Sequence, residues 1–148
     1  MNYFAYGSNM DVMQVARRCP GANVRGPGFI HGFAFRINRY GVATIVPSNR
    51  TVHGLVWDIT PEHEARLDEY EGVFMGFYSK EQISVRLVDD SQVEALVYVA
   101  ANSQPGQPRP GYLGLIIEAA KAQAFPPAYL AELQTWQKSQ PDPKTAAF

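Results

Sequence analysis

Apolar and polar residues alternate with a period of two in several segments of the chain, which is typical of half-buried β-strands. In Phe29–Ile37, every second residue is Phe, His, Phe, Phe and Ile, and this alternation predicts one aromatic face turned toward a core. Segments rich in valine, isoleucine, leucine and tyrosine predict further strands at Tyr3–Tyr6, Gly41–Val46, Val52–Ile59, Tyr78–Val88 and Gln92–Ala100. The turn Asp89-Asp90-Ser91 between the last two predicts a β-hairpin.

Four segments have a helical pattern instead. Three of them are Met10–Cys19, which ends at Pro20-Gly21, and the pair Gly111–Phe125 and Pro127–Lys138. The fourth is Pro61–Glu71, which begins after an N-capping threonine and ends before a glycine. Strands and helices in this order predict an α+β domain on a curved or closed sheet, because antiparallel strands leave edges that must be covered.

Composition fits a single folded domain. The chain has 148 residues, of which 46% are hydrophobic and 18% charged, so it can bury an ordinary core. We expect residues 1–138 to form the domain and residues 139–148 to be a flexible tail.

The formal net charge of −1 argues against a nucleic-acid partner, since nucleic-acid binders usually carry a basic surplus. The charge is uneven: residues 1–57 hold six arginines and one acid, and residues 58–148 hold seven basic and 13 acidic residues. This asymmetry suits either an acidic small ligand near the N-terminal half or pairing between the two halves.

The lone cysteine, Cys19, cannot form an internal disulfide, which fits a reducing compartment. The N-terminus lacks the features of a signal peptide, and no segment approaches the roughly 18 consecutive apolar residues of a membrane span. We therefore expect a cytoplasmic protein with no membrane partner.

One carboxylate stands out in the helix Pro61–Glu71. At about 100° per residue, His63, Leu67 and Tyr70 share a face, and Glu71 lies about 40° from Leu67. Glu71 is thus expected to lie against the protein, at the helix end where the macrodipole disfavours a carboxylate. Both effects raise a pKa and make a carboxylate a useful proton carrier near neutral pH. The alternative is a helix end exposed to water.

The segment Tyr6-Gly7-Ser8-Asn9 joins the first strand directly to a helix. Glycine lets the backbone turn without a Cβ, and free N–H groups at a helix start can bind a carboxylate or an oxyanion. Alternatively, Ser8 or Asn9 serves only as an N-cap.

Together these two segments resemble the gamma-glutamylcyclotransferase family. The Tyr6–Asn9 loop is similar to its N-terminal signature, and Leu67–Val73 is similar to the segment that carries its catalytic glutamate. Tyr78 and Tyr112 match tyrosines of its site, and the resemblance runs from Asn2 to Trp136. It implies a small mixed or closed β-barrel flanked by helices. It also implies a catalytic residue, Glu71, and substrate-binding residues, which are Tyr6, Gly7, Ser8, Asn9, Tyr78 and Tyr112.

The reaction implied by the resemblance is attack of a substrate's own α-amine on its gamma-glutamyl amide. It releases 5-oxoproline and a free amine or amino acid, as in glutathione-related metabolism, and requires no cofactor, metal or covalent nucleophile. We expect the Pro-containing loop Asn102–Pro110 to border the pocket and to select the leaving amine. The leaving amine and the oligomeric state stay open. The alternative function is a non-catalytic small-molecule binding or interaction protein of the same fold.

Other candidate chemistry is weaker. The three histidines, His31, His53 and His63, lack paired metal-ligand spacing and are expected to pack or cap helices. Cys19 has no adjacent His or Lys and is expected to be a buried structural thiol. Ser8 lacks the Gly-x-Ser-x-Gly setting of a hydrolase nucleophile.

Overall fold

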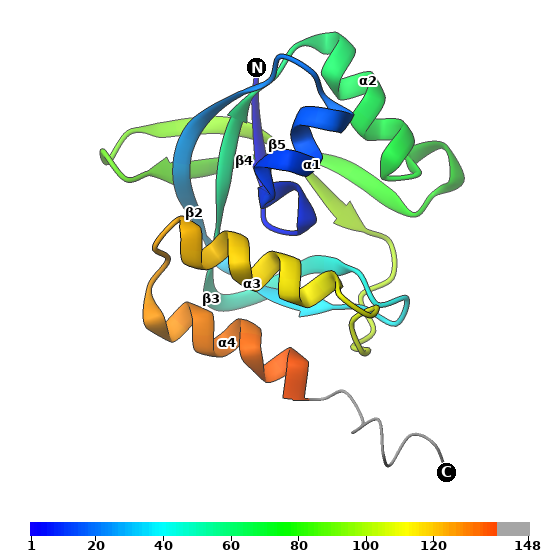
Figure 1. The fold of residues 1–148 in the computed structure, drawn as a ribbon, viewed down its shortest axis with the longest axis vertical. Helices are drawn as coiled ribbons and strands as arrows, with labels where there is room; N and C mark the ends of the chain where they lie inside the picture. The colour runs from blue at the N-terminus through cyan, green and yellow to red at the C-terminus, as the bar shows by residue number, and fades with distance from the viewer. Residues whose placement is uncertain (139–148) are drawn as a thin grey trace.

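Five strands close into a barrel in a computed structural model that describes residues 1–138 (Figure 1). The strands are β1 (Asn2–Ala5), β2 (Asn23–Ile37), β3 (Ala43–Asp58), β4 (Tyr78–Leu87) and β5 (Gln92–Ala100). Their order around the barrel is β1-β3-β2-β4-β5, and the parallel pair β1–β5 closes a set of otherwise antiparallel neighbours. The predicted α+β class with a closed mixed barrel is therefore confirmed, as is the hairpin between β4 and β5. The predicted tail, residues 139–148, lies outside the described residues.

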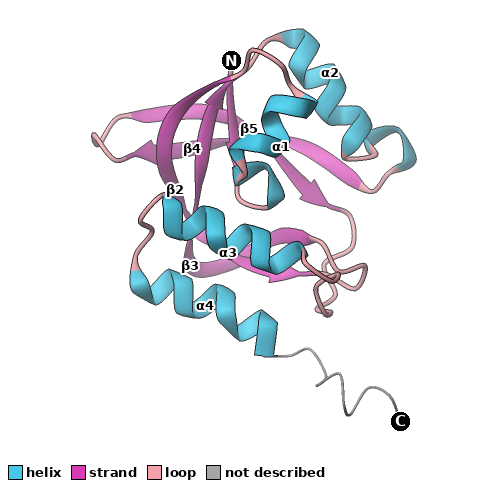
Figure 2. Cartoon of the chain, in the orientation of Figure 1, coloured by secondary structure: helices cyan, strands magenta, loops and turns pink. Residues whose placement is uncertain are grey.

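Four helices flank the barrel: α1 (Val12–Arg18), α2 (Pro61–Tyr70), α3 (Tyr112–Ala122) and α4 (Pro127–Lys138). Figure 2 shows α3 and α4 side by side, with α1 and α2 nearer the chain's N-terminus. Two short 3₁₀ turns, Ser8–Met10 and Val73–Met75, follow β1 and α2. None of the helices within residues 1–138 is long and apolar enough to cross a membrane.

The long strands β2 and β3 differ from the sequence prediction in two ways. The segments predicted as separate strands, Gly41–Val46 and Val52–Ile59, form parts of one strand, β3, which pairs with β2 on both sides of an irregularity. There the register shifts between His31 and Phe33, and Gly32 has a φ of 89°. Ile30 is buried before the shift, whereas Phe35 is buried after it. A single inward face for Phe29–Ile37 is thus wrong, because the shift exchanges the two faces of the strand.

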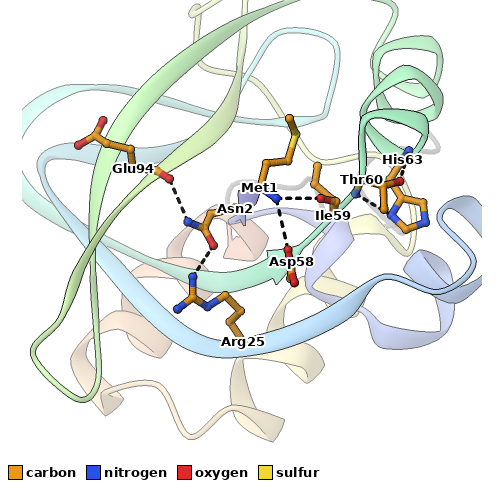
Figure 3. A network of polar contacts seen from close by, with 8 residues as sticks. All are labelled: Met1, Asn2, Arg25, Asp58, Ile59, Thr60, His63 and Glu94. Carbon is orange, nitrogen blue, oxygen red and sulfur yellow. Dashed lines mark hydrogen bonds and ion pairs between the residues drawn. The ribbon is translucent and has the colours of Figure 1, made fainter.

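The start of α2 is fixed by a reciprocal capping box, seen in Figure 3. The backbone N–H of His63 donates to Oγ1 of Thr60 over 3.2 Å, and the N–H of Thr60 donates to Nδ1 of His63 over 3.1 Å. Since Nδ1 accepts, Nε2 carries the hydrogen and donates to the carbonyl of Pro20 at 2.7 Å. His63 is therefore a capping residue, as predicted, and it ties α2 to the turn after α1.

The side of α2 that faces the sheet is held by an ionic cluster. Nζ of Lys80 in β4 lies 2.8 Å from Glu64 and 2.9 Å from Asp68, and the hydroxyl of Tyr98 in β5 donates to Asp68 over 2.7 Å. The cluster and the capping box fix the helix at several points. The residue that follows its last turn, Glu71, is consequently held in a defined position.

Candidate active site

A cavity of about 1170 Å³ lies where the loop after β1, the end of α2 and the starts of β4 and α3 meet. It is lined by all seven residues that the sequence singled out, namely Tyr6, Gly7, Ser8, Asn9, Glu71, Tyr78 and Tyr112. The loop Asn102–Pro110 contributes Asn102 and Arg109 to the wall, which confirms that it borders the pocket. Segments separated by about a hundred residues thus build one site.

The loop after β1 is held rigidly through Asn9. The buried Asn9 side chain donates to the Tyr3 hydroxyl at 2.9 Å, and its Oδ1 accepts hydrogen bonds from Gln14 and Arg18, each at 3.0 Å. Its backbone carbonyl accepts from Nε1 of Trp57 at 3.1 Å. Asn9 therefore lines the cavity, but its side-chain amide serves the protein and anchors the loop.

Gly7 and Ser8 lead from β1 into the first 3₁₀ turn. Gly7 is the N-cap of that turn, and its carbonyl accepts from the N–H of Met10 at 3.1 Å. The N–H groups at the start of such a turn have no carbonyl partner within it. The Ser8 hydroxyl accepts from Nε2 of Gln14 at 2.9 Å, so a side chain positions the loop. The backbone N–H groups at the start of the turn stay available.

Two tyrosine hydroxyls form hydrogen bonds with the backbone of Ala43, one as a donor and the other as an acceptor. The Tyr78 hydroxyl donates to the Ala43 carbonyl at 2.7 Å, whereas the Tyr112 hydroxyl accepts from the Ala43 N–H at 3.0 Å. Tyr112 thus keeps its own O–H hydrogen to donate, and Tyr78 keeps lone pairs to accept. Burial raises the pKa of Tyr112 to about 12, so it stays protonated. The Tyr6 hydroxyl donates to the Tyr98 carbonyl.

Glu71 caps the end of α2, where Gly72 turns the chain with a φ of 64°. Burial raises the pKa of Glu71 to about 7, and the nearby charge of Arg18 opposes that rise. No hydrogen bond from a side chain of residues 1–138 is among the causes of this shift in the pKa of Glu71. The predicted rise in pKa is confirmed, and the alternative of a helix end exposed to water is wrong.

Tyr70, expected on the buried face, is 56% exposed because it lies on the edge of that face in the last turn.

Arg18 is the main residue that sequence reasoning missed. It lies in the last turn of α1, donates to Oδ1 of Asn9, and places its guanidinium carbon 4.7 Å from the centre of the Tyr70 ring. A basic residue in the last turn of a helix is favoured by the helix dipole, which gives no hint of a site. Only the fold brings this charge to Glu71.

Of the remaining candidates, His53 and Cys19 are packed as expected, whereas His31 is exposed on β2. His53 packs among aromatic rings, with Tyr129 at 4.8 Å, and His31 contacts the Thr51 hydroxyl at 2.8 Å. Cys19 is buried, and burial raises the pKa of its thiol, which disfavours the reactive thiolate. Over residues 1–138, no group of three histidine, cysteine or acidic side chains could hold a metal ion.

Comparison with known proteins points to one group of relatives. Residues 51–133 match the model of the AIG2-like family. Two curated proteins named "Gamma-glutamylcyclotransferase", from Mus musculus and Homo sapiens, are 29% and 28% identical over 143 residues, which is 89% of this chain and 76% of each relative. A solved structure titled "Gamma-glutamyl cyclotransferase" matches with a TM-score of 0.85 at 27% identity, covering 97% of this chain and 89% of the other.

Proposed function

This chain belongs to the AIG2-like family, and we propose that it is a gamma-glutamylcyclotransferase. The observation that carries the proposal is Glu71, a partly buried carboxylate with a pKa near 7 in a cavity that also holds the loop Tyr6–Asn9. A carboxylate with this pKa can both accept and donate a proton at neutral pH. A curated relative named "Gamma-glutamylcyclotransferase" and a solved structure titled "Gamma-glutamyl cyclotransferase" also support this chemistry.

The proposed reaction closes a five-membered ring. The substrate's α-amine attacks its own γ-carbonyl carbon, a new C–N bond forms, and the bond to the leaving nitrogen breaks. Glu71 takes the proton that the α-amine loses and gives it to the leaving nitrogen, so the enzyme is regenerated. A free α-amine has a pKa of about 8, close to that of Glu71, which suits proton transfer between them. Both reacting groups belong to one molecule, so the site needs mainly to hold it folded.

The other lining groups fit the charges of this reaction. In the proposal, the N–H groups of Gly7 and Ser8 hold the glutamyl unit and support the developing oxyanion. Tyr112 donates its free hydrogen, and Tyr78 offers lone pairs to the amine. The cation of Arg18 attracts the substrate carboxylate toward Glu71.

We further propose that the protein acts in the cytoplasm, on a small gamma-glutamyl compound, without a cofactor. The lone cysteine supports the cytoplasmic location, because it fits a reducing compartment. The near-neutral net charge supports a small substrate, because it argues against a nucleic-acid partner. The intramolecular mechanism supports the absence of a cofactor, since it asks only for proton transfer and oriented hydrogen bonds.

The direct test is to incubate the protein with gamma-glutamylalanine and to measure 5-oxoproline and alanine, with and without a chelator. We expect equal amounts of the two products, unaffected by the chelator. A non-catalytic binding protein, the second candidate, would bind the dipeptide in calorimetry without releasing either product. Loss of release on chelation, restored by one metal, would contradict the cofactor-free mechanism.

A change at Arg18 should shift the pH profile of that reaction. Arg18 lowers the pKa of Glu71, so Arg18→Gln is expected to raise it. Because Glu71 must be deprotonated to accept the proton, the acidic limb of kcat/KM should move to higher pH than the wild-type limb near pH 7. Arg17→Gln, on the same helix, is the control. An unmoved acidic limb in Arg18→Gln would show that this limb does not report Glu71.

A further inference from the structure

Apolar side chains form one wall of the cavity directly beside Glu71. They come from the segment that follows α2, in which Gly72 and Gly76 both have positive φ and enclose the 3₁₀ turn Val73–Met75. Met75 and Phe77 line the cavity although they are 75% and 56% exposed. Apolar surface left open to water inside a cavity is typical of a place where ligand binds.

Phe77 is a fixed part of this wall. Its N–H donates to the Gly72 carbonyl at 3.1 Å, and its carbonyl accepts from Ala101 at 3.0 Å. Its ring packs so closely on Gly72 that a Cβ there would lie 2.7 Å from Cδ2 of Phe77. The backbone of Phe77 is therefore fixed and its ring already contacts Gly72 before any ligand arrives, which lowers the entropic cost of binding against it.

The neighbouring Phe74 provides a contrast. It is 97% exposed and does not line the cavity. The two phenylalanines therefore lie in the same short segment but face different surroundings. This makes Phe74 a matched control for Phe77.

The proposed reaction locates the leaving group on the same side. Glu71 must reach the leaving nitrogen, and the glutamyl unit occupies the loop Gly7–Ser8 in that mechanism. The substituent on the leaving nitrogen then extends from Glu71 toward the rest of the lining, where Met75 and Phe77 belong to the segment that directly follows Glu71. A cavity of about 1170 Å³ is also large for a glutamyl unit alone, because drug-sized ligands occupy pockets of about 300–1000 Å³.

We propose that Met75 and Phe77 form a leaving-group subsite that selects gamma-glutamyl compounds whose leaving amine carries an aromatic or large apolar side chain. The inference rests on the proposed function and adds to it the chemical class of the leaving group. Aromatic rings pack favourably on a fixed phenylalanine, and methionine adapts to their shape.

The test compares gamma-glutamylphenylalanine with gamma-glutamylalanine as substrates. We expect kcat/KM for the phenylalanine compound to be about 10-fold or more higher in the wild type, mostly through a lower KM. Phe77→Ser and, separately, Met75→Ser should each reduce this preference several-fold, whereas Phe74→Ser should preserve it. The two subsite variants are independent, so one that fails to fold does not remove the test.

The outcomes separate the two proposals. Release of 5-oxoproline from neither compound would overturn the proposed function and the subsite with it. Release from both at equal kcat/KM, or a preference that Phe77→Ser and Met75→Ser leave unchanged, would overturn the subsite alone. A loss of preference in Phe74→Ser as large as that in Phe77→Ser would also overturn it, since Phe74 does not line the cavity.

Discussion

Glu71→Gln is expected to lower kcat for a gamma-glutamyl substrate by about 10²–10⁴-fold, the usual contribution of general acid–base catalysis. Glutamine keeps the volume and the polar character of the side chain but cannot accept the proton of the α-amine. Substrate affinity should change little, because the loop and the tyrosines that bind the glutamyl unit in the proposed mechanism are untouched. The measurement is steady-state release of 5-oxoproline, together with calorimetric binding to the inactive variant.

Glu62→Gln is the matched control, since Glu62 lies on the same helix, is exposed and does not line the cavity. It should retain wild-type activity. If Glu71→Gln also kept most of the wild-type activity, Glu71 would have no part in the proton transfer, and another group in the cavity would have to carry it.

Glu71→Gln should also stabilise the fold against unfolding at neutral and higher pH. Burial raises the pKa of Glu71 from 4.5 to about 7, so the folded state favours the protonated form. The wild type therefore loses stability as the pH rises through this range, by about 3 kcal/mol once Glu71 is fully charged. Glu71→Gln removes that penalty. Thermal unfolding should show a higher Tm than wild type at pH 8 and an equal Tm at pH 4, which also shows that the inactive variant is folded.

The parts of the fold that sequence could predict depend on neighbouring residues. The capped helix Pro61–Tyr70 and the hairpin around Asp90 are specified by short local patterns, and both are found. The shift between His31 and Phe33 depends on how two long strands pair, and an alternating pattern cannot reveal it. For the same reason, the sequence could not show that β3 is continuous through its irregular middle.

In the site, too, some features depend on the local sequence and others depend on tertiary contacts. Glu71 could be proposed as a site residue from the sequence because a helix end and a buried helix face are local features. Whether each tyrosine hydroxyl remains free to donate or to accept depends on its hydrogen bond with Ala43, which is distant in the sequence. Tyr78 donates to the Ala43 carbonyl, and Tyr112 accepts from the Ala43 N–H. Arg18 reaches the site only because α1 packs beside the end of α2. Such roles follow from tertiary contacts, which the sequence pattern does not contain.

The structure shows what a glycine provides at position 7. A glycine before a turn suggests a positive φ that other residues avoid, but the φ of Gly7 is −112°. The structural requirement is space instead. A Cβ at this position would lie 3.3 Å from both Cβ of Ala43 and the hydroxyl of Tyr112, closer than an ordinary contact.

Gly7→Val is therefore expected to lower kcat/KM by at least about 10²-fold, comparable to the loss of one oxyanion-binding donor. The valine methyl groups extend past the tight Cβ position, displace the Tyr112 hydroxyl from the Ala43 N–H, and narrow the approach to the loop. Gly7→Ala should lose less, because Cβ alone requires a shift of a few tenths of an ångström. Circular dichroism and thermal unfolding establish that each variant is folded before its kinetics are compared.

Ser8→Ala distinguishes the backbone from the hydroxyl. The Ser8 hydroxyl accepts a hydrogen bond from Gln14, and Gln14 also donates to Asn9, so the loop keeps its second support when the hydroxyl is removed. If the N–H groups of Gly7 and Ser8 hold the glutamyl unit, Ser8→Ala should cost only a few-fold in kcat/KM while Gly7→Val is severe. The reverse order, with Ser8→Ala as damaging as Glu71→Gln and Gly7→Val still active, would replace the backbone mechanism with one that depends on the serine hydroxyl.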